Sequence, residues 1–129
     1  MKRILNSFPY AIALWFFAAI AVTAASSLAG SEWGMAGQDM PFVRFEAGGR
    51  VTGHAGCNRF FGSYETDGEK FKAGPLGATR MACPGAVMEK EQAFLSSLQN
   101  ARRFTRRGAR LELIDGKGKV LTLVQRDWD

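Results

Sequence analysis

Apolar and polar residues alternate along several short stretches of the chain. Residues 42–46 place apolar side chains at alternating positions, with Arg44 and Glu46 on the opposite face. A period of two is typical of a half-buried β-strand. Similar patterns, separated by glycine-containing turns at 47–49, 67–68 and 115–118, predict strands at 28–33, 50–54, 60–64, 70–73, 76–78, 103–105, 110–114 and 120–124.

One segment between Met81 and Asn100 has a helical period instead. Its apolar side chains fall three or four residues apart and define one helical face with a carboxylate on it, at Val87, Glu91, Phe94, Leu95 and Leu98. Pro84 suits the first turn of this helix. Strands, one helix and then more strands, joined by hairpins, predict a mainly β (α+β) domain, an antiparallel barrel with the helix packed across it.

The first residues resemble an export signal. Lys2 and Arg3 precede an uncharged apolar run at 10–22, which is shorter than the roughly 20 residues of a membrane-spanning helix. Small residues follow, so we expect cleavage after Ala24 or Ala25, a signal peptide at 1–25 and one domain at 26–129. The protein would then be periplasmic or secreted. Retention of the segment as an uncleaved membrane anchor is the alternative.

Residues 28–31 (LAGS) have the form of a lipoprotein cleavage box, but Ser31 stands where the acylated cysteine is required. We therefore expect no lipid attachment and interpret this stretch as the start of the first strand.

Three blocks resemble the signature segments of the META domain family: residues 53–64 (GHAGCNRFFGSY), 78–84 (ATRMACP) and 88–98 (MEKEQAFLSSL). The family includes the heat-shock-inducible HslJ-like proteins. The resemblance implies a lipocalin-like antiparallel β barrel with one helix and no catalytic activity. It also implies a function in heat stress or antibiotic tolerance. Many bacterial members are lipoproteins, and Ser31 departs from that pattern.

Cys57 and Cys83 are the only cysteines. An even count in an exported chain favours a disulfide, with two buried free thiols as the alternative. His54 is the only histidine, and two cysteines with one histidine at these spacings match no standard zinc pattern. A Cys–His nucleophile pair lacks an obvious orienting group. We expect no metal, no cofactor and no enzymatic activity.

Polar residues lie beside both cysteines, at Asn58, Thr79, Arg80 and Glu91. A carboxylate on an apolar helix face must be paired or hydrogen-bonded, and Arg80 is a candidate partner for Glu91. We interpret the four residues as a structural polar cluster that attaches the helix to the sheet. The alternative is a ligand site with Arg80 as its anion anchor.

The chain has a net charge of +5, and 15 basic against 12 acidic residues remain without Lys2 and Arg3. This mild excess does not indicate nucleic acid as a partner. The densest charge run contains Arg102, Arg103, Arg106, Arg107 and Arg110. We interpret it as a solvated strand edge, and an anionic membrane surface is the alternative partner.

These features predict a monomeric, non-enzymatic envelope protein that acts through binding or interaction with an unidentified partner. Two alternatives stay open: a small-ligand module that uses the barrel interior, and a protein-interaction or inhibitor domain.

Overall fold

The computed structural model describes residues 27–127. This part of the chain contains one 16-residue helix, α1 (Gly85–Asn100), and nine strands. The strands are β1 (Ser31–Gly34), β2 (Phe42–Glu46), β3 (Arg50–His54), β4 (Arg59–Asp67), β5 (Lys70–Ala73), β6 (Gly77–Ala78), β7 (Ala101–Arg107), β8 (Arg110–Asp115) and β9 (Val120–Arg126).

The strands form a closed antiparallel barrel. Neighbouring strands follow the order β3-β2-β1-β9-β8-β7-β5-β4, and β3 also pairs with β4, which closes the ring. Strand β6 pairs only with β4 and lies outside that ring. The weakest seam joins β5 to β7, where Lys70 and Arg103 are the one aligned pair. The predicted barrel is confirmed.

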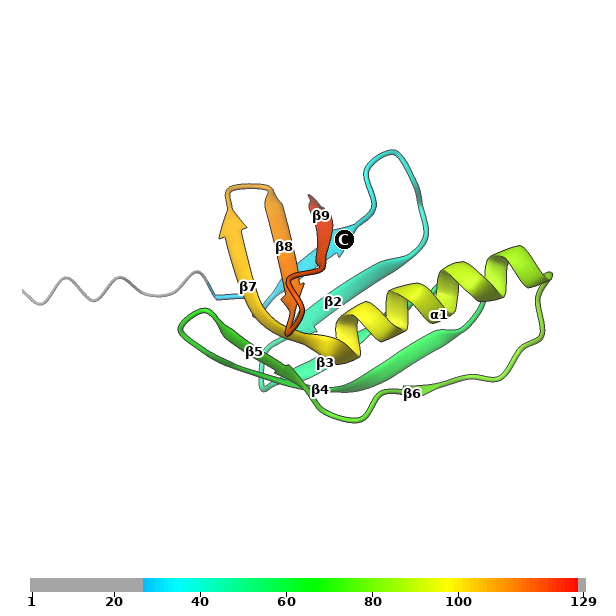
Figure 1. Cartoon of the computed structure of the whole chain (residues 1–129), viewed down its shortest axis with the longest axis horizontal. Helices are drawn as coiled ribbons and strands as arrows, with labels where there is room; N and C mark the ends of the chain where they lie inside the picture. The colour runs from blue at the N-terminus through cyan, green and yellow to red at the C-terminus, as the bar shows by residue number, and fades with distance from the viewer. Residues whose placement is uncertain (1–26, 128–129) are drawn as a thin grey trace, which may run out of the picture.

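Helix α1 packs across the barrel and continues directly into β7 (Figure 1). Its buried residues are Glu91, Phe94 and Leu98, as the helical period predicted. The Phe94 ring meets the edge of Phe60 from β4, with centroids 6.0 Å apart. Pro84 is the residue before the helix rather than part of its first turn.

Side chains from all parts of the sheet fill the barrel interior. Trp33, Val43, Phe45, Leu111 and Leu123 are fully buried. The rings of Phe45, Tyr64 and Phe71 pack together, with edge-on contacts at centroid distances of 4.9 and 5.9 Å. These rings are part of the buried core inside the barrel.

The alternating patterns predicted the first and last residues of several strands correctly. The predicted strands at 42–46, 50–54 and 70–73 match β2, β3 and β5. The expected strand edge at the arginine run is wrong, because β7 pairs with β8 on one side and with β5 on the other.

Within residues 27–127, no helix combines the length and the apolar character needed to cross a membrane. The predicted signal peptide lies outside the described residues.

Candidate functional site

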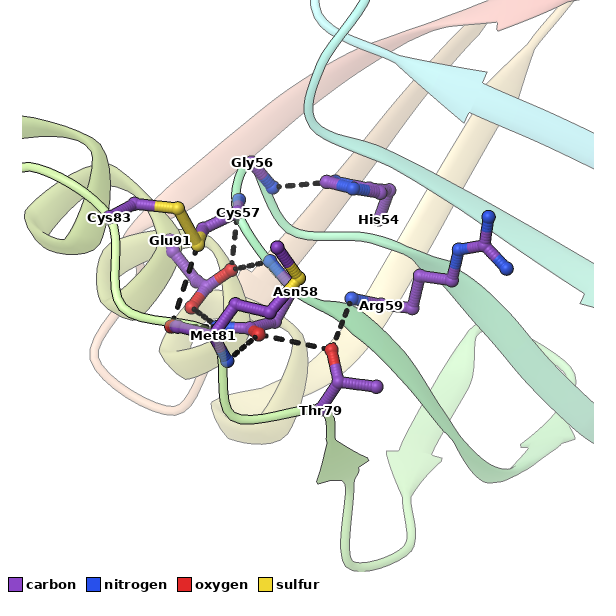
Figure 2. Close-up of a disulfide and its surroundings, with 9 residues drawn as sticks. All are labelled: His54, Gly56, Cys57, Asn58, Arg59, Thr79, Met81, Cys83 and Glu91. Carbon is purple, nitrogen blue, oxygen red and sulfur yellow. Dashed lines mark hydrogen bonds between the residues drawn. A yellow bond between two sulfur atoms is a disulfide. The ribbon is translucent and has the colours of Figure 1, made fainter.

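A disulfide joins Cys57, in the turn after β3, to Cys83, just before α1. Figure 2 shows this bond beside a group of polar side chains from both segments and from the helix. The predicted pairing of the two cysteines is confirmed. Because both cysteines are in the disulfide, Cys57 has no thiolate that would act as a nucleophile.

Asn58 connects the elements around the disulfide. Its Oδ1 accepts hydrogen bonds from the Met81 backbone N–H at 2.6 Å and from the Thr79 hydroxyl at 3.0 Å. Its Nδ2 donates to the Met81 carbonyl at 3.2 Å and to Glu91 Oε2 at 2.8 Å. One buried amide side chain therefore fixes the 79–81 segment against both the turn and the helix.

Glu91 is the buried carboxylate of this cluster, and only 2% of it is exposed. Its Oε1 accepts the backbone N–H groups of Cys57 at 3.1 Å and Asn58 at 2.6 Å. Burial alone raises the pKa of the Glu91 carboxyl. The hydrogen bonds from Asn58 and Cys57, aided by nearby His54, favour the charged form and hold that pKa below its usual value.

The predicted partnership of Arg80 with Glu91 is wrong. Arg80 is exposed, and no ion pair joins it to Glu91 in residues 27–127. Backbone N–H groups and Asn58 already satisfy the carboxylate, so it needs no guanidinium partner. Asn58, Thr79 and Glu91 do come together, while Arg80 lies outside the cluster.

His54 has a structural contact in the turn. Its Nδ1 accepts the backbone N–H of Gly56 at 3.1 Å. The side chain of the neighbouring Arg59 points away from the cluster in Figure 2. We therefore interpret the cluster as a structural network of hydrogen bonds that holds β3, β4 and α1 together.

The arginine run lies on β7 and at the start of β8, and most of its members have partners. A register shift between Ala101 and Arg103 leaves Arg102 and Arg103 both exposed. The Arg106 guanidinium lies 5.0 Å from the ring centroid of Trp33 and donates to the Ser27 carbonyl at 2.6 Å. Arg110 pairs with Glu112 at 3.0 Å. Arg107 is exposed and lines a small cleft beside that pair.

A second buried carboxylate, Glu32 on β1, was not predicted. It is 4% exposed and pairs with Arg44 at 2.5 Å and Arg126 at 3.6 Å. Both guanidinium groups also lie over the Phe42 ring, at 5.2 and 5.0 Å. Alternation between Ser31 and Trp33 indicates that the Glu32 side chain faces away from the core, but it does not indicate the ion pairs with Arg44 and Arg126 that accompany its burial.

The outer surface carries several open clefts. Two of them have volumes of about 770 and 590 Å³. One lies between the β4–β5 hairpin and the end of α1, and the other covers the outer face of β2, β3 and β4. A third cleft of about 350 Å³ lies between α1, the β1–β2 loop and the start of β9.

Comparison with protein families gives a match to the META domain over residues 21–128. No curated protein matches the chain significantly. Among solved structures, an NMR structure of a protein from Burkholderia xenovorans is 27% identical. That match covers 78% of this chain and 85% of the other, with a TM-score of 0.65.

Two further solved structures share the fold. A second NMR structure is 20% identical over 73% of this chain and 87% of the other, with a TM-score of 0.58. A crystal structure of a DUF4847 family protein from Bacteroides vulgatus is 18% identical over 69% and 61% of the two chains, with a TM-score of 0.55. The fold is therefore shared with proteins of low sequence identity.

Proposed function

We propose that this chain, which belongs to the META domain family, is an exported, non-catalytic binding protein of the cell envelope. In this role it supports tolerance of heat or of envelope-active antibiotics. The observation that carries the proposal is the Cys57–Cys83 disulfide at the centre of the polar cluster. Disulfides persist in oxidising compartments and are rare in the cytosol.

The polar cluster supports a structural role for its residues rather than a catalytic one. The Glu91 carboxylate is occupied by Asn58 and backbone N–H groups, and Cys57 is bonded to Cys83. A general acid or base must reach the proton that it transfers. Because Glu91 is buried and its oxygens already accept hydrogen bonds from Asn58 and Cys57, we infer that it stabilises the fold.

Binding on the outer surface fits the packed interior. Phe45, Tyr64 and Phe71 occupy the space that a ligand would need inside the barrel. The alternative of a ligand in the interior is therefore disfavoured, and the open clefts on the outside are the candidate sites.

A protein-interaction domain is the second candidate function, and one exposed side chain favours it. Phe61 on β4 is 52% exposed and lines the same outer cleft as Arg59. Large aromatic side chains and arginine are enriched at protein interfaces. Replacement of Phe61 by Ser should weaken binding to such a partner without unfolding the barrel.

Complementation of a deletion strain tests the proposed function. We expect the deletion to increase sensitivity to heat or to envelope-active drugs, and the full chain to restore tolerance. The matched control is the same chain without residues 2–25, which should accumulate in the cytoplasm and fail to restore it. Equal rescue by both forms would show that export is not required, and unchanged sensitivity of the deletion would contradict the tolerance role.

A further inference from the structure

The cleft of about 350 Å³ beside α1 combines an apolar floor with a positive rim. Small-molecule sites range over about 300–1,000 Å³ and are mostly apolar with a few polar groups. The apolar side chains of this cleft are Met35, Pro41, Ala93, Phe94, Val120 and Leu121. The charged ones are Lys90 from the helix and Lys119 from the turn before β9.

The floor of the cleft is part of the packed core. Phe94 is 4% exposed and contacts Phe60 inside the barrel. Met35 and Leu121 are half-buried and pack against the same core. At the rim, Val120 is 48% exposed, an apolar side chain that water covers when the cleft is empty. Contact with an apolar chain would remove that surface from water.

Within residues 27–127, the two lysines of the rim take part in no salt bridge. Each of the four ion pairs in residues 27–127 involves an arginine, so neither Lys90 nor Lys119 belongs to one. The acidic group nearest in the chain to Lys119 is Asp115, whose Oδ1 accepts the backbone N–H groups of Lys117 and Lys119 at 2.8 Å each. These hydrogen bonds, together with the charges of Lys117 and Lys119, hold the pKa of the Asp115 carboxyl below its usual value. Asp115 therefore offsets part of the Lys119 charge, whereas Lys90 has no such neighbour among the four ion pairs. A ligand with a negative head group would complement the rim.

In the two larger clefts most of the positive charge is already offset by carboxylates. The cleft of about 770 Å³ contains Glu65 and Asp67 together with its basic residues. In the cleft of about 590 Å³, two of the three arginines are already paired, Arg44 with Glu32 and Arg50 with Glu46, and the third is Arg59.

We propose that the cleft between α1, the β1–β2 loop and β9 binds a single-chain amphiphile with an anionic head group, of the long-chain carboxylate class. The chain lies on Met35, Phe94 and Leu121, and the head group contacts Lys90 and Lys119. This site rests on the proposed binding function and names its ligand class.

Calorimetric titration of the protein, purified from the envelope fraction, with dodecanoate below its micellar concentration tests the site. We expect saturable binding of one dodecanoate per chain. Acetate, which lacks the apolar chain, and dodecyltrimethylammonium, which has the opposite charge, should not compete. Replacement of both rim lysines, Lys90→Gln with Lys119→Gln, should weaken dodecanoate binding about five-fold, since exposed ion contacts are individually weak.

Filling the cleft tests the location. Ala93 is exposed on α1 and lines the cleft, so Ala93→Trp should block it without disturbing the core and weaken binding at least about ten-fold. Val120→Glu, at the exposed rim, should weaken binding through charge repulsion and gives a second variant if the first unfolds. The controls are Gln92→Trp, on the opposite helix face, and Lys117→Gln, in the same turn as Lys119; both should bind as the parent does.

Binding that is equally strong in Ala93→Trp, or equally weak in Gln92→Trp, would overturn the site. Competition by dodecyltrimethylammonium would overturn the charge assignment. A dimer that Ala93→Trp disrupts, with no dodecanoate binding, would show that the cleft seats a second copy of the chain and would also overturn the proposal. The complementation experiment measures the tolerance of cells without added dodecanoate. A protein that does not bind dodecanoate can therefore be distinguished from one that has no function in the envelope.

Discussion

The Ser31 hydroxyl accepts a hydrogen bond from the indole Nε1 of Trp33 at 2.7 Å and donates one to the Leu28 carbonyl at 2.5 Å. All three residues are buried. Ser31 occupies the position at which a lipoprotein would carry its acylated cysteine. Here that position belongs to the core at the start of β1, so the chain from Leu28 onward is part of the folded domain.

Ser31→Ala should lower the free energy of unfolding by about 1–3 kcal/mol, because the Trp33 indole N–H is left buried without an acceptor. Urea denaturation followed by circular dichroism measures the change. Ser96→Ala, at an exposed position on α1, is the control and should change stability by less than about 0.5 kcal/mol. Equal effects of the two substitutions would show that the Ser31–Trp33 bond contributes nothing.

Removal of the disulfide by Cys57→Ala with Cys83→Ala should cost about 3–4 kcal/mol of stability, from the loop entropy of a sequence separation of 26 residues. Urea denaturation of the oxidised parent, the reduced parent and the double variant measures this cost. The reduced parent should resemble the double variant. If all three forms unfold at the same urea concentration, the disulfide is not a main support of the fold.

Glu91→Gln should destabilise the protein by about 2–3 kcal/mol at neutral pH. Glutamine retains one acceptor oxygen, and its amide nitrogen would face donors that now point at a carboxylate. Glu89→Gln, at an exposed position on the same helix, is the matched control and should unfold like the parent. Equal stability of the Glu91 and Glu89 variants would contradict the role of the buried carboxylate.

The acid dependence of stability should carry the signature of Glu91. The pKa of Glu91 in the folded protein lies below the usual value for a glutamate. Its carboxylate therefore contributes stability at pH values above that usual pKa, and this contribution is lost as the pH falls through the pKa of the folded protein. Urea midpoints measured from pH 7 to about pH 3 should therefore fall more steeply for the parent than for Glu91→Gln. Parallel curves would contradict the lowered pKa.

Arg106 and Arg103 lie on the same strand but should differ in their effect on folding. Arg106 covers the Trp33 ring, and Arg106→Ala should cost about 1–2 kcal/mol through loss of this cation–π contact and its packing. Arg103 is exposed, and Arg103→Ala should change stability by less than about 0.5 kcal/mol. Thermal unfolding of both variants gives the comparison, and a larger cost for Arg103 would contradict the assignment.

The sequence predicted the barrel well because its strands are half-buried and separated by clear turns. The alternation at 42–46 and 50–54 matches β2 and β3. The helical face was also correct, including the exceptional carboxylate of Glu91. These features depend on which side chains of one strand or helix face the core, and the spacing of apolar residues along the sequence indicates this directly.

The errors concern partners that are distant in sequence. Charge alone suggested Arg80 for Glu91, whereas the fold brings the backbone N–H groups of Cys57 and Asn58 to the carboxylate. Closure of the barrel placed β7 between two strands, which a local charge pattern does not reveal. The cleft beside α1 joins three separate segments, so no single stretch of sequence indicated it.

Mass spectrometry of the protein recovered from the envelope fraction tests the central claim, export of a disulfide-linked domain, most directly. Thiols are alkylated during lysis, before the intact mass and the N-terminal peptide are measured. The account predicts a mature N-terminus at Ala25 or Ser26 and a peptide pair that joins Cys57 to Cys83, with no alkylated cysteine. A chain that begins at Met1 and carries alkyl groups on both Cys57 and Cys83 would contradict it.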